Sequence, residues 1–333
     1  MTQDSRISGA AGKALQGAVA GTRRLVAPLL GVQLRDDPRT AAPEESAIAP
    51  AASVPAAVTS APPIMPATAS AAPPLHPVPM AERLAAWRAG EPLPLALTGQ
   101  AHARIRGRDV TFCLNIARDP IQNCHRAGKF YEQTELDALT ALLPAAATVL
   151  DIGANIGNHA LYLALFAGAA RIVVIEPNPL ALEALVGNVL ANRLEGVIDL
   201  DHLGFGLGEA DSAGWGMKPH DRNLGATKMQ PGKGALQVRR GDDVFPDLMP
   251  DLVKIDVEGM EMEVLAGLEA LIARARPILL VEVEHDRQIA FLDWARARSY
   301  RPGRPGRHND KKANFLLQPE ALPGPDRTDP SKE

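Results

Sequence analysis

The chain has 333 residues, a formal net charge of −4 at pH 7 and only 4% aromatic residues. This composition disfavours a nucleic-acid partner, because nucleic acids are usually bound by basic patches and by aromatic stacking. Its two cysteines fit neither a zinc spacing nor a disulfide framework, so we expect a reducing, cytoplasmic compartment. No run approaches the ~18 apolar residues that span a bilayer, and the N-terminus lacks the order of a signal peptide, so no transmembrane segment is expected.

The first 80 residues differ in composition from the rest. Residues 1–36 have scattered apolar and basic positions and predict a weak helix, with a surface helix for membrane or partner contact as the alternative. Residues 37–80 are dominated by alanine and proline, which cannot bury enough apolar surface to offset the entropy of ordering. We therefore expect a disordered linker there, a folded domain over residues 81–320, and a disordered tail over residues 321–333.

From residue 81 the pattern becomes that of a folded domain. Residues 81–88 predict a short helix. Two strands at residues 102–106 and 110–115, separated by Gly107-Arg108-Asp109, predict an N-terminal hairpin. Residues 133–143 then predict a helix, because their leucines recur on one face.

Strands and helices alternate over the remainder of the domain. The strands are almost continuously apolar, which predicts a doubly wound α/β fold with a mostly parallel sheet covered on both faces. Residues 205–250 interrupt the alternation, since they hold many glycines and few helix formers, and predict a hairpin-rich insertion. The predicted strands are 148–152, 171–176, 198–204, 251–257, 278–283 and 315–318, and the predicted helices are 158–166, 179–191, 260–273 and 287–297.

A glycine-rich turn, Asp151-Ile152-Gly153-Ala154-Asn155-Ile156-Gly157, joins the first parallel strand to its helix. Ligands of doubly wound sheets bind beyond the carboxyl ends of the strands, where glycines allow a close approach of the backbone. A dinucleotide fingerprint needs glycine at its first, third and sixth positions, and counted from Gly153 the latter two are asparagines. Asp151 would repel a pyrophosphate but suits the ammonium of a methionyl group; its alternative role is to cap the turn.

The next strand ends in Glu176, which lies ~20 residues beyond the first glycine, where a carboxylate can accept hydrogen bonds from ribose hydroxyls. A solvated strand end is the alternative for this residue. Asn178 either faces an adenine ring or opens the following turn. The predicted cofactor-binding residues are Asp151, Gly153, Ala154, Asn155, Gly157, Glu176 and Asn178.

A charged strand supplies the second candidate region. Lys254, Asp256 and Glu258 fall on one face of the strand predicted at residues 251–257 and its continuation. Charges on a strand buried on both faces are costly unless they are paired or face a ligand. One interpretation is a Lys254–Asp256 salt bridge with Glu258 in the first turn of the next helix. The other is that the two carboxylates line a reaction pocket.

These motifs resemble the FkbM-type methyltransferase family, and Lys254-Ile255-Asp256-Val257-Glu258-Gly259 is the most specific of them. The resemblance implies a class I methyltransferase (Rossmann-like) fold and methyl transfer from S-adenosylmethionine, usually to a hydroxyl oxygen of a sugar, glycolipid or natural product. It does not extend to the N-terminal helix and linker. The matching segments are 128–132, 151–157, 176–177, 223–225, 251–259, 263–267, 277–284 and 314–317.

Methyl transfer is an in-line displacement, so the protein must hold the acceptor oxygen close to the methyl group. A sugar hydroxyl is weakly acidic and needs a general base or a hydrogen-bond acceptor, whereas a carboxylate acceptor needs no base. The acidic residues leave a divalent metal open, but their spacing gives no ligand set. The catalytic candidates are Asp256, then Glu258 and His285, and the predicted substrate-binding residues are Lys254, His220 and Asn223.

Three other functions compete with this hypothesis. A nicotinamide-dependent, NAD(P)-type oxidoreductase could use a similar sheet, but the glycine fingerprint fails. A non-catalytic scaffold or binding module could dock a partner through its N-terminal segment, yet Asp151, Glu176 and Asp256 are all present. A nucleic-acid methyltransferase is disfavoured by the acidic balance and the few aromatic residues. The sequence leaves the acceptor and the oligomeric state open.

Overall fold

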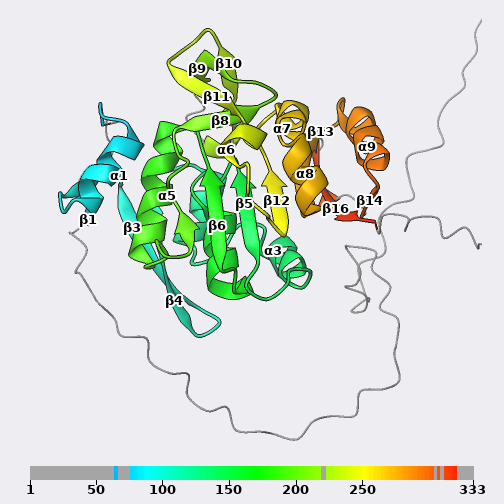
Figure 1. The fold of residues 1–333 in the computed structure, drawn as a ribbon. Coiled ribbons are helices and arrows are strands. Elements are labelled where there is room, and N and C mark those ends of the chain that lie inside the picture. Colours follow the sequence, from blue (N-terminus) through cyan, green and yellow to red (C-terminus); the bar gives the residue numbers. More distant parts are fainter. Residues whose placement is uncertain (1–63, 67–75, 219–222, 304–305, 308–310, 321–333) are drawn as a thin grey trace, which may run out of the picture.

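The computed structural model describes residues 64–66, 76–218, 223–303, 306–307 and 311–320 (Figure 1). The helix predicted at residues 1–36, the tail at 321–333 and His220 lie outside these residues, as does most of the predicted linker. The part of the linker that is described includes β1 (Ile64–Pro66), which pairs in parallel with β2 (Leu93–Leu95).

A mostly parallel sheet forms the middle layer of the domain, in the order β14-β16-β13-β12-β5-β6-β7. All neighbours pair in parallel except β16, which runs antiparallel to both β13 and β14. The chain moves outward from β5 in one direction to β6 and β7, and then in the other from β12, so the strand order reverses between β5 and β12. This confirms the predicted doubly wound fold of the class I methyltransferase (Rossmann-like) type. The strands are β5 (Thr148–Ile152), β6 (Arg171–Ile175), β7 (Ile198–Asp199), β12 (Leu252–Ile255), β13 (Ile278–Glu284), β14 (Tyr300–Pro302) and β16 (Lys312–Pro319), with β15 (Gly306–Arg307) paired to β16.

Helices cover both faces of this sheet (Figure 1). Side chains alternate between the faces along each strand, so Val149 joins one apolar core while Leu150 and Ile152 join the other. The first core contains residues of α1, α3, α4 and α5, and the second contains residues of α7, α8 and α9. These helices are α1 (Met80–Arg88), α3 (Gln133–Thr140), α4 (Asn158–Tyr162), α5 (Pro179–Ala191), α7 (Glu261–Gly267), α8 (Glu269–Ala275) and α9 (Gln288–Ala297).

The N-terminal hairpin is confirmed. Strands β3 (Gly99–Ile105) and β4 (Arg108–Leu114) pair antiparallel and are joined by Arg106 and Gly107. Both turn residues have positive φ, 49° and 79°, as a two-residue hairpin loop of the I′ type requires. The hairpin packs on α5, where a Cβ at Gly187 would lie 3.0 Å from Cys113.

Several predicted boundaries were wrong. The helix expected at 158–166 is α4 followed by a π-helical turn, Leu163–Ala167. The helix expected at 260–273 is two helices that break at Leu268. Gly267, the last residue of the first, packs against the carbonyl oxygen of Gly208, which lies 2.0 Å from where a Cβ would be, so a side chain is excluded there. The strands expected at 198–204 and 251–257 end early, at Asp199 and Ile255, and the helix expected at 133–143 ends at Thr140.

The structure also contains elements that the sequence analysis missed. Helix α2 (Pro120–Arg126) begins at Asp119, whose side chain accepts a hydrogen bond of 2.9 Å from the backbone N–H of Gln122. An aspartate followed by proline is a recognisable helix start, so the signal was present. Strands β2 and β14 are three residues long and carry no comparable signal.

The insertion forms a separate four-stranded sheet in the order β10-β9-β11-β8, which stands at one end of the central sheet (Figure 1). Its hairpin of β9 and β10 agrees with the predicted hairpin-rich segment, and β11 closes it by pairing with both β9 and β8. The strands are β8 (Phe205–Gly208), β9 (Ser212–Met217), β10 (Met229–Pro231) and β11 (Leu236–Arg240).

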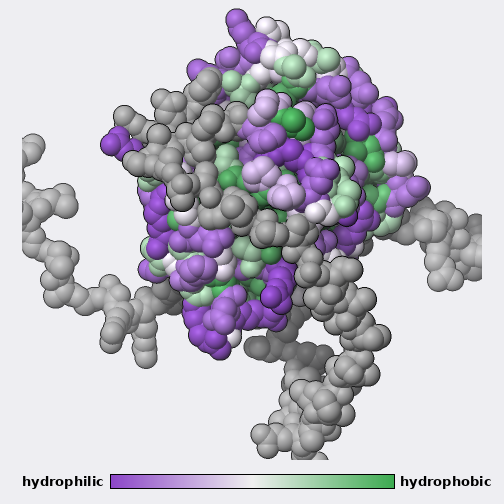
Figure 2. Space-filling model, turned by 90° about the vertical axis from the view of Figure 1, so that its left-hand side faces the viewer, coloured by the Kyte–Doolittle hydropathy of each residue, from purple (hydrophilic) through white to green (hydrophobic). Residues whose placement is uncertain are grey.

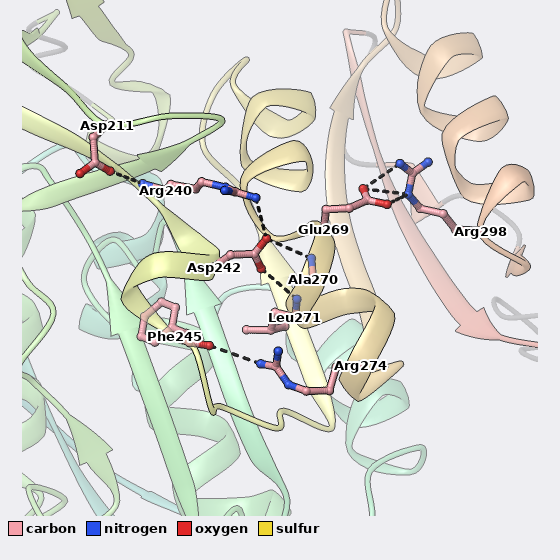
Figure 3. A network of polar contacts seen from close by, with 9 residues as sticks. All are labelled: Asp211, Arg240, Asp242, Phe245, Glu269, Ala270, Leu271, Arg274 and Arg298. Atoms are coloured by element: carbon pink, nitrogen blue, oxygen red, sulfur yellow. Dashed lines mark hydrogen bonds and ion pairs between the residues drawn. The ribbon is translucent and has the colours of Figure 1, made fainter.

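A polar network fixes this insertion to the helices behind it (Figure 3). After β11 the chain forms α6 (Gly241–Val244), where the carboxylate of Asp242 accepts hydrogen bonds of 3.0 and 2.9 Å from the backbone N–H groups of Ala270 and Leu271. These are unpaired donors of the first turn of α8, so a side chain from a distant segment caps that helix. The insertion and α8 are thereby held in one arrangement.

The surface seen from the side of α1 is chiefly hydrophilic, with apolar residues in small scattered areas (Figure 2). Large apolar side chains that are exposed within the described residues are Val78, Met249 and Ile289. Among the helices in the described ranges, none is both long and apolar enough to cross a membrane.

Candidate functional site

A cavity of about 460 Å³ opens where β5, β12 and β13 end. The loop after β5 contributes Gly153, Ala154 and Asn155, and the segment after β12 contributes Asp256 and Glu258. A smaller hollow of about 50 Å³ is also lined by Gly153, Asn155, Asp256 and Glu258, and it extends to Glu176 after β6. Both lie beside the reversal of strand order, where doubly wound sheets bind their ligands.

The glycine-rich loop is held against its neighbours by backbone contacts. The N–H groups of Gly153 and Ala154 both donate to the carbonyl oxygen of Ile175, at 2.9 and 3.0 Å. Gly153 has φ +75°, and a Cβ there would lie 1.8 Å from the carbonyl oxygen of Asp256, so a side chain is excluded. Asn155 and Gly157 also have positive φ, and Gly157 starts α4 without lining either cavity.

Lys254 forms the buried centre of the site. It lies opposite Asp151 in the register of β12 and β5, and its Nζ is 3.0 Å from Asp151 Oδ1. The same ammonium donates to the carbonyl oxygen of Gly153 at 2.8 Å and lies 3.9 Å from Asp256 Oδ2. The contact with Gly153 is a hydrogen bond, and the contacts with Asp151 and Asp256 are ion pairs. Burial opposes the charge, but Asp151 and Asp256 outweigh it and raise the pKa of Lys254.

This arrangement changes the interpretation of two predicted residues. The Lys254–Asp256 salt bridge considered from the sequence is present, yet it is the longer of two. The closer partner, Asp151, was missed as a partner, although both residues are charges inside adjacent apolar strands. Lys254 lines the main cavity, whereas Asp151 is only 1% exposed and lines neither cavity.

Glu176 lies at the far end of the smaller hollow and is 6% exposed. Its two oxygens accept hydrogen bonds of 2.7 Å from the backbone N–H groups of Asn155 and Asn178. Burial raises the pKa of Glu176 to about 7, against the opposing effect of these two donors. Each carboxylate oxygen has a second lone pair, so both can still accept a hydrogen bond from a ligand.

Asn178 opens the turn before α5. Its Oδ1 accepts a hydrogen bond of 3.1 Å from the N–H of Leu180, which is the helix-capping role, and the residue lines neither cavity. The sequence left two roles open for Asn178, and the structure shows the one in which it opens the turn before α5.

Carboxylates gather at the opposite end of the main cavity. Asp256, Glu258 and Glu282 each offer an oxygen, and these oxygens lie within 4.8 Å of one another. Burial and the charge of Asp256 raise the pKa of Glu258, while Lys312 opposes the shift. Asp256 Oδ1 and Asn155 Oδ1 are buried and have no hydrogen-bond partner within the described part of the chain. This end of the cavity is therefore suited to ligands that donate hydrogen bonds.

The predicted histidine is not brought to this cavity. His285 is exposed and lines neither cavity. His159, which sequence reasoning overlooked, does line the main cavity, and its Nε2 lies 3.7 Å from Glu132 Oε2. Burial, followed by the charge of Lys254, lowers the pKa of His159. Its position immediately after the glycine-rich turn was the available signal.

Asn223 lines the main cavity, and its role in binding substrate stays a prediction. It precedes the short 3-10 helix Leu224–Ala226, and the N–H of Leu224 donates to Asp119 Oδ2 at 2.8 Å. Because the other oxygen of Asp119 caps α2, this one carboxylate ties the Asn223 segment to the wall formed by α2.

Residues 151–302 match the model of the FkbM methyltransferase domain. This segment of the chain is thereby assigned to the FkbM methyltransferase domain family. The FkbM domain includes Lys254, Asp256 and Glu258, whereas Glu132 and Lys312 reach the same cavity from outside the matched range.

Curated relatives match part of the chain. The hexuronic acid methyltransferase AglP of Haloferax volcanii is 30% identical over 142 residues, which are 40% of this chain and 56% of the relative. Methyltransferase sdnD of Sordaria araneosa is 32% identical over 168 residues, 39% of this chain and 63% of the relative. The chain thus spans between 56% and 63% of the length of these two relatives.

A crystal structure of methyltransferase FkbM from Methylobacillus flagellatus is also similar, with 21% identity over 59% of this chain and 52% of that chain. Its TM-score of 0.37 is too low to add to the fold assignment, which follows from the strand order.

Replacing Gly153 with alanine should disrupt the site far more than the same change at Gly168. Both glycines have positive φ, but a Cβ at Gly168 meets nothing within 4 Å, whereas one at Gly153 collides with the backbone of Asp256. We expect Gly168→Ala to cost about 1 kcal/mol, the strain of a left-handed alanine, and Gly153→Ala to cost several times more. Chemical denaturation of both variants measures this difference; equal losses of unfolding free energy would show that the contact does not constrain the loop.

Proposed function

We propose that this chain is an S-adenosylmethionine-dependent O-methyltransferase whose acceptor is a hydroxyl on a sugar, glycolipid or natural product. The observation that carries the proposal is the pair of adjoining cavities lined largely by the FkbM-matched residues, with Glu176 in the smaller one and the Asp256 carboxylate in the wall that they share. The similarity to a protein named hexuronic acid methyltransferase supports a sugar acceptor.

In this proposal the cofactor would be held by residues that line the two adjoining cavities. Glu176 would accept hydrogen bonds from the ribose hydroxyls with its second lone pairs, and Gly153, Ala154 and Asn155 would allow the ligand to approach the backbone closely. Asp151, Gly157 and Asn178 act by shaping the loop, since none of the three lines a cavity. Asp151 does so through its ion pair with Lys254.

S-adenosylmethionine supplies an electrophilic methyl group on a sulfonium centre. The chain's own task is then to hold the acceptor oxygen in line with that methyl and to accept its hydrogen bond. Asp256 is placed for this, because its Oδ1 is unpartnered among the described residues and it lines both cavities. Glu258 lies beside it as a second acceptor, and Asn223 lines the same cavity.

Lys254 contributes by orientation in this proposal. Its ammonium fixes both the carbonyl of Gly153 on the cofactor side and the carboxylate of Asp256 on the acceptor side. The predicted role of Lys254 in substrate binding is therefore indirect, through the carboxylate that it holds. His285 has no part in this mechanism, because it lies away from both cavities.

Calorimetric titration with S-adenosylmethionine tests the cofactor site. The wild-type chain should bind in the micromolar range, and Glu176→Ala should weaken binding at least tenfold, about 1.4 kcal/mol, because the ribose loses its acceptor. Glu209→Ala removes an exposed carboxylate of the insertion and should bind as the wild type does. If the folded wild-type chain does not bind the cofactor, the proposal fails and the scaffold hypothesis is favoured.

Cofactor recognition by Glu176 should also depend on pH. Since the pKa of this carboxyl is raised to about 7, the acceptor form is the minority at pH 6 and the majority at pH 8. Adenosine carries the ribose hydroxyls without an amino-acid group, so its affinity reports this titration alone. We expect its affinity to rise by about tenfold from pH 6 to pH 8, in proportion to the ionised fraction. An affinity that stays flat, or the same rise in Glu176→Ala, would contradict this role.

A further inference from the structure

The carboxylates at the acceptor end of the cavity already have a cation among them. Lys312 Nζ lies 2.5 Å from Glu258 Oε2 and 2.6 Å from Glu282 Oε1. These two carboxylates and Asp256 are the same three whose oxygens lie within 4.8 Å of one another. Carboxylate oxygens so arranged resemble the ligand set of a hard divalent cation, which holds oxygens at about 2.0–2.6 Å.

Three separate elements are needed to build this arrangement. Glu282 lies in β13 and Lys312 in the antiparallel β16, where Glu282 pairs with Asn314, so Lys312 is its diagonal neighbour on the same face. Glu258 follows β12 and has φ 58°, a left-handed conformation that is rare for a residue with a side chain. Gly259 continues the turn with φ 104°, and this turn brings Glu258 to the lysine.

The burial and charge of Lys312 suit its ammonium to remain permanently beside Glu258 and Glu282. Its side chain is 14% exposed, against 11% and 8% for Glu258 and Glu282, so solvent screens these contacts weakly. Burial opposes its charge, yet Glu258 and Glu282 outweigh this and raise the pKa of Lys312. The ammonium therefore stays charged across the physiological range and neutralises carboxylates that would otherwise repel one another.

We propose that Lys312 is the resident cation of the acceptor site, and that its ammonium takes the position among Asp256, Glu258 and Glu282 in which a divalent metal would otherwise bind. In this position Lys312 keeps Glu258 turned into the cavity and leaves Asp256 available to the acceptor. It is thus a positioning residue for the proposed reaction, which then requires no metal. The inference rests on the proposed function for the identity of the ligand, but its test needs neither an acceptor nor turnover.

Binding of Mn²⁺ to the full chain, followed by electron paramagnetic resonance and calorimetry, tests the proposal. Lys312→Met removes the ammonium and leaves three adjacent carboxylates, so it should bind Mn²⁺ at least tenfold more tightly than the wild type. Lys228→Met is the matched control, because Lys228 lines the same cavity and pairs with Glu284, outside the three-carboxylate set. Lys312→Arg retains a cation and should resemble the wild type.

If Lys312→Met is partly unfolded, the effect of Mn²⁺ on its melting temperature tests the same cation site. Mn²⁺ should raise the melting temperature of that variant and leave the wild type and Lys312→Arg unchanged. Wild-type binding as tight as that of Lys312→Met would overturn the proposal, since the lysine would not occupy the site. Absence of Mn²⁺ binding in every variant would also overturn it, because the carboxylates would not form a cation position. Neither result depends on whether S-adenosylmethionine binds.

Discussion

The site depends on the contacts that the buried ammonium of Lys254 makes. This ammonium joins the ends of two adjacent strands, because Asp151 and Gly153 belong to β5 and its loop while Asp256 follows β12. These strands flank the reversal of strand order, which is where doubly wound sheets bind their ligands. Removing one member of a buried ion pair costs about 3–5 kcal/mol, since it leaves the other charge uncompensated. The lysine thus fixes the relative position of the loop and the carboxylate.

Most of the buried carboxylates of the site are balanced by a lysine, as Asp151 is by Lys254. Lys254 balances Asp151 beneath the loop, and Lys312 balances Glu258 and Glu282 at the acceptor end. Glu176, at the other end, is held by backbone N–H groups rather than by a cation. Asp256 differs from these carboxylates in its position, because it lines both cavities and its buried Oδ1 has no hydrogen-bond partner among the described residues.

The sequence predicts the sheet well because its signals are local. Apolar strands, the turn at Gly107 and the proline that opens α5 act within a few residues, and each appears in the structure. The pairing of Lys254 with Asp151 connects residues 103 positions apart and depends on strand order, which periodicity does not encode. The close approach of Gly208 to Gly267 likewise joins residues far apart in the sequence.

The sequence predicted most of the residues that line the candidate site, but not the contacts and turns that bring them together. The loop, Glu176, Asp256 and Glu258 all line the cavities, but for Glu258 the reason differs from the one given. Strand alternation was expected to direct it, whereas β12 ends at Ile255 and a left-handed turn places the side chain. His159 was missed although it follows the glycine-rich turn directly, and Lys312 was missed because its strand position carries no motif.

A double-mutant cycle on Asp151 and Lys254 tests most directly whether this ion pair organises the site. Asp151→Asn and Lys254→Met should each lower the unfolding free energy by about 3–5 kcal/mol. Together they should cost at least 1 kcal/mol less than their sum, because the double variant buries no unpaired charge. Glu183→Gln combined with Lys254→Met is the control and should be additive, since Glu183 pairs with Arg83 on another part of the domain. Additive losses for Asp151 and Lys254 would contradict the account.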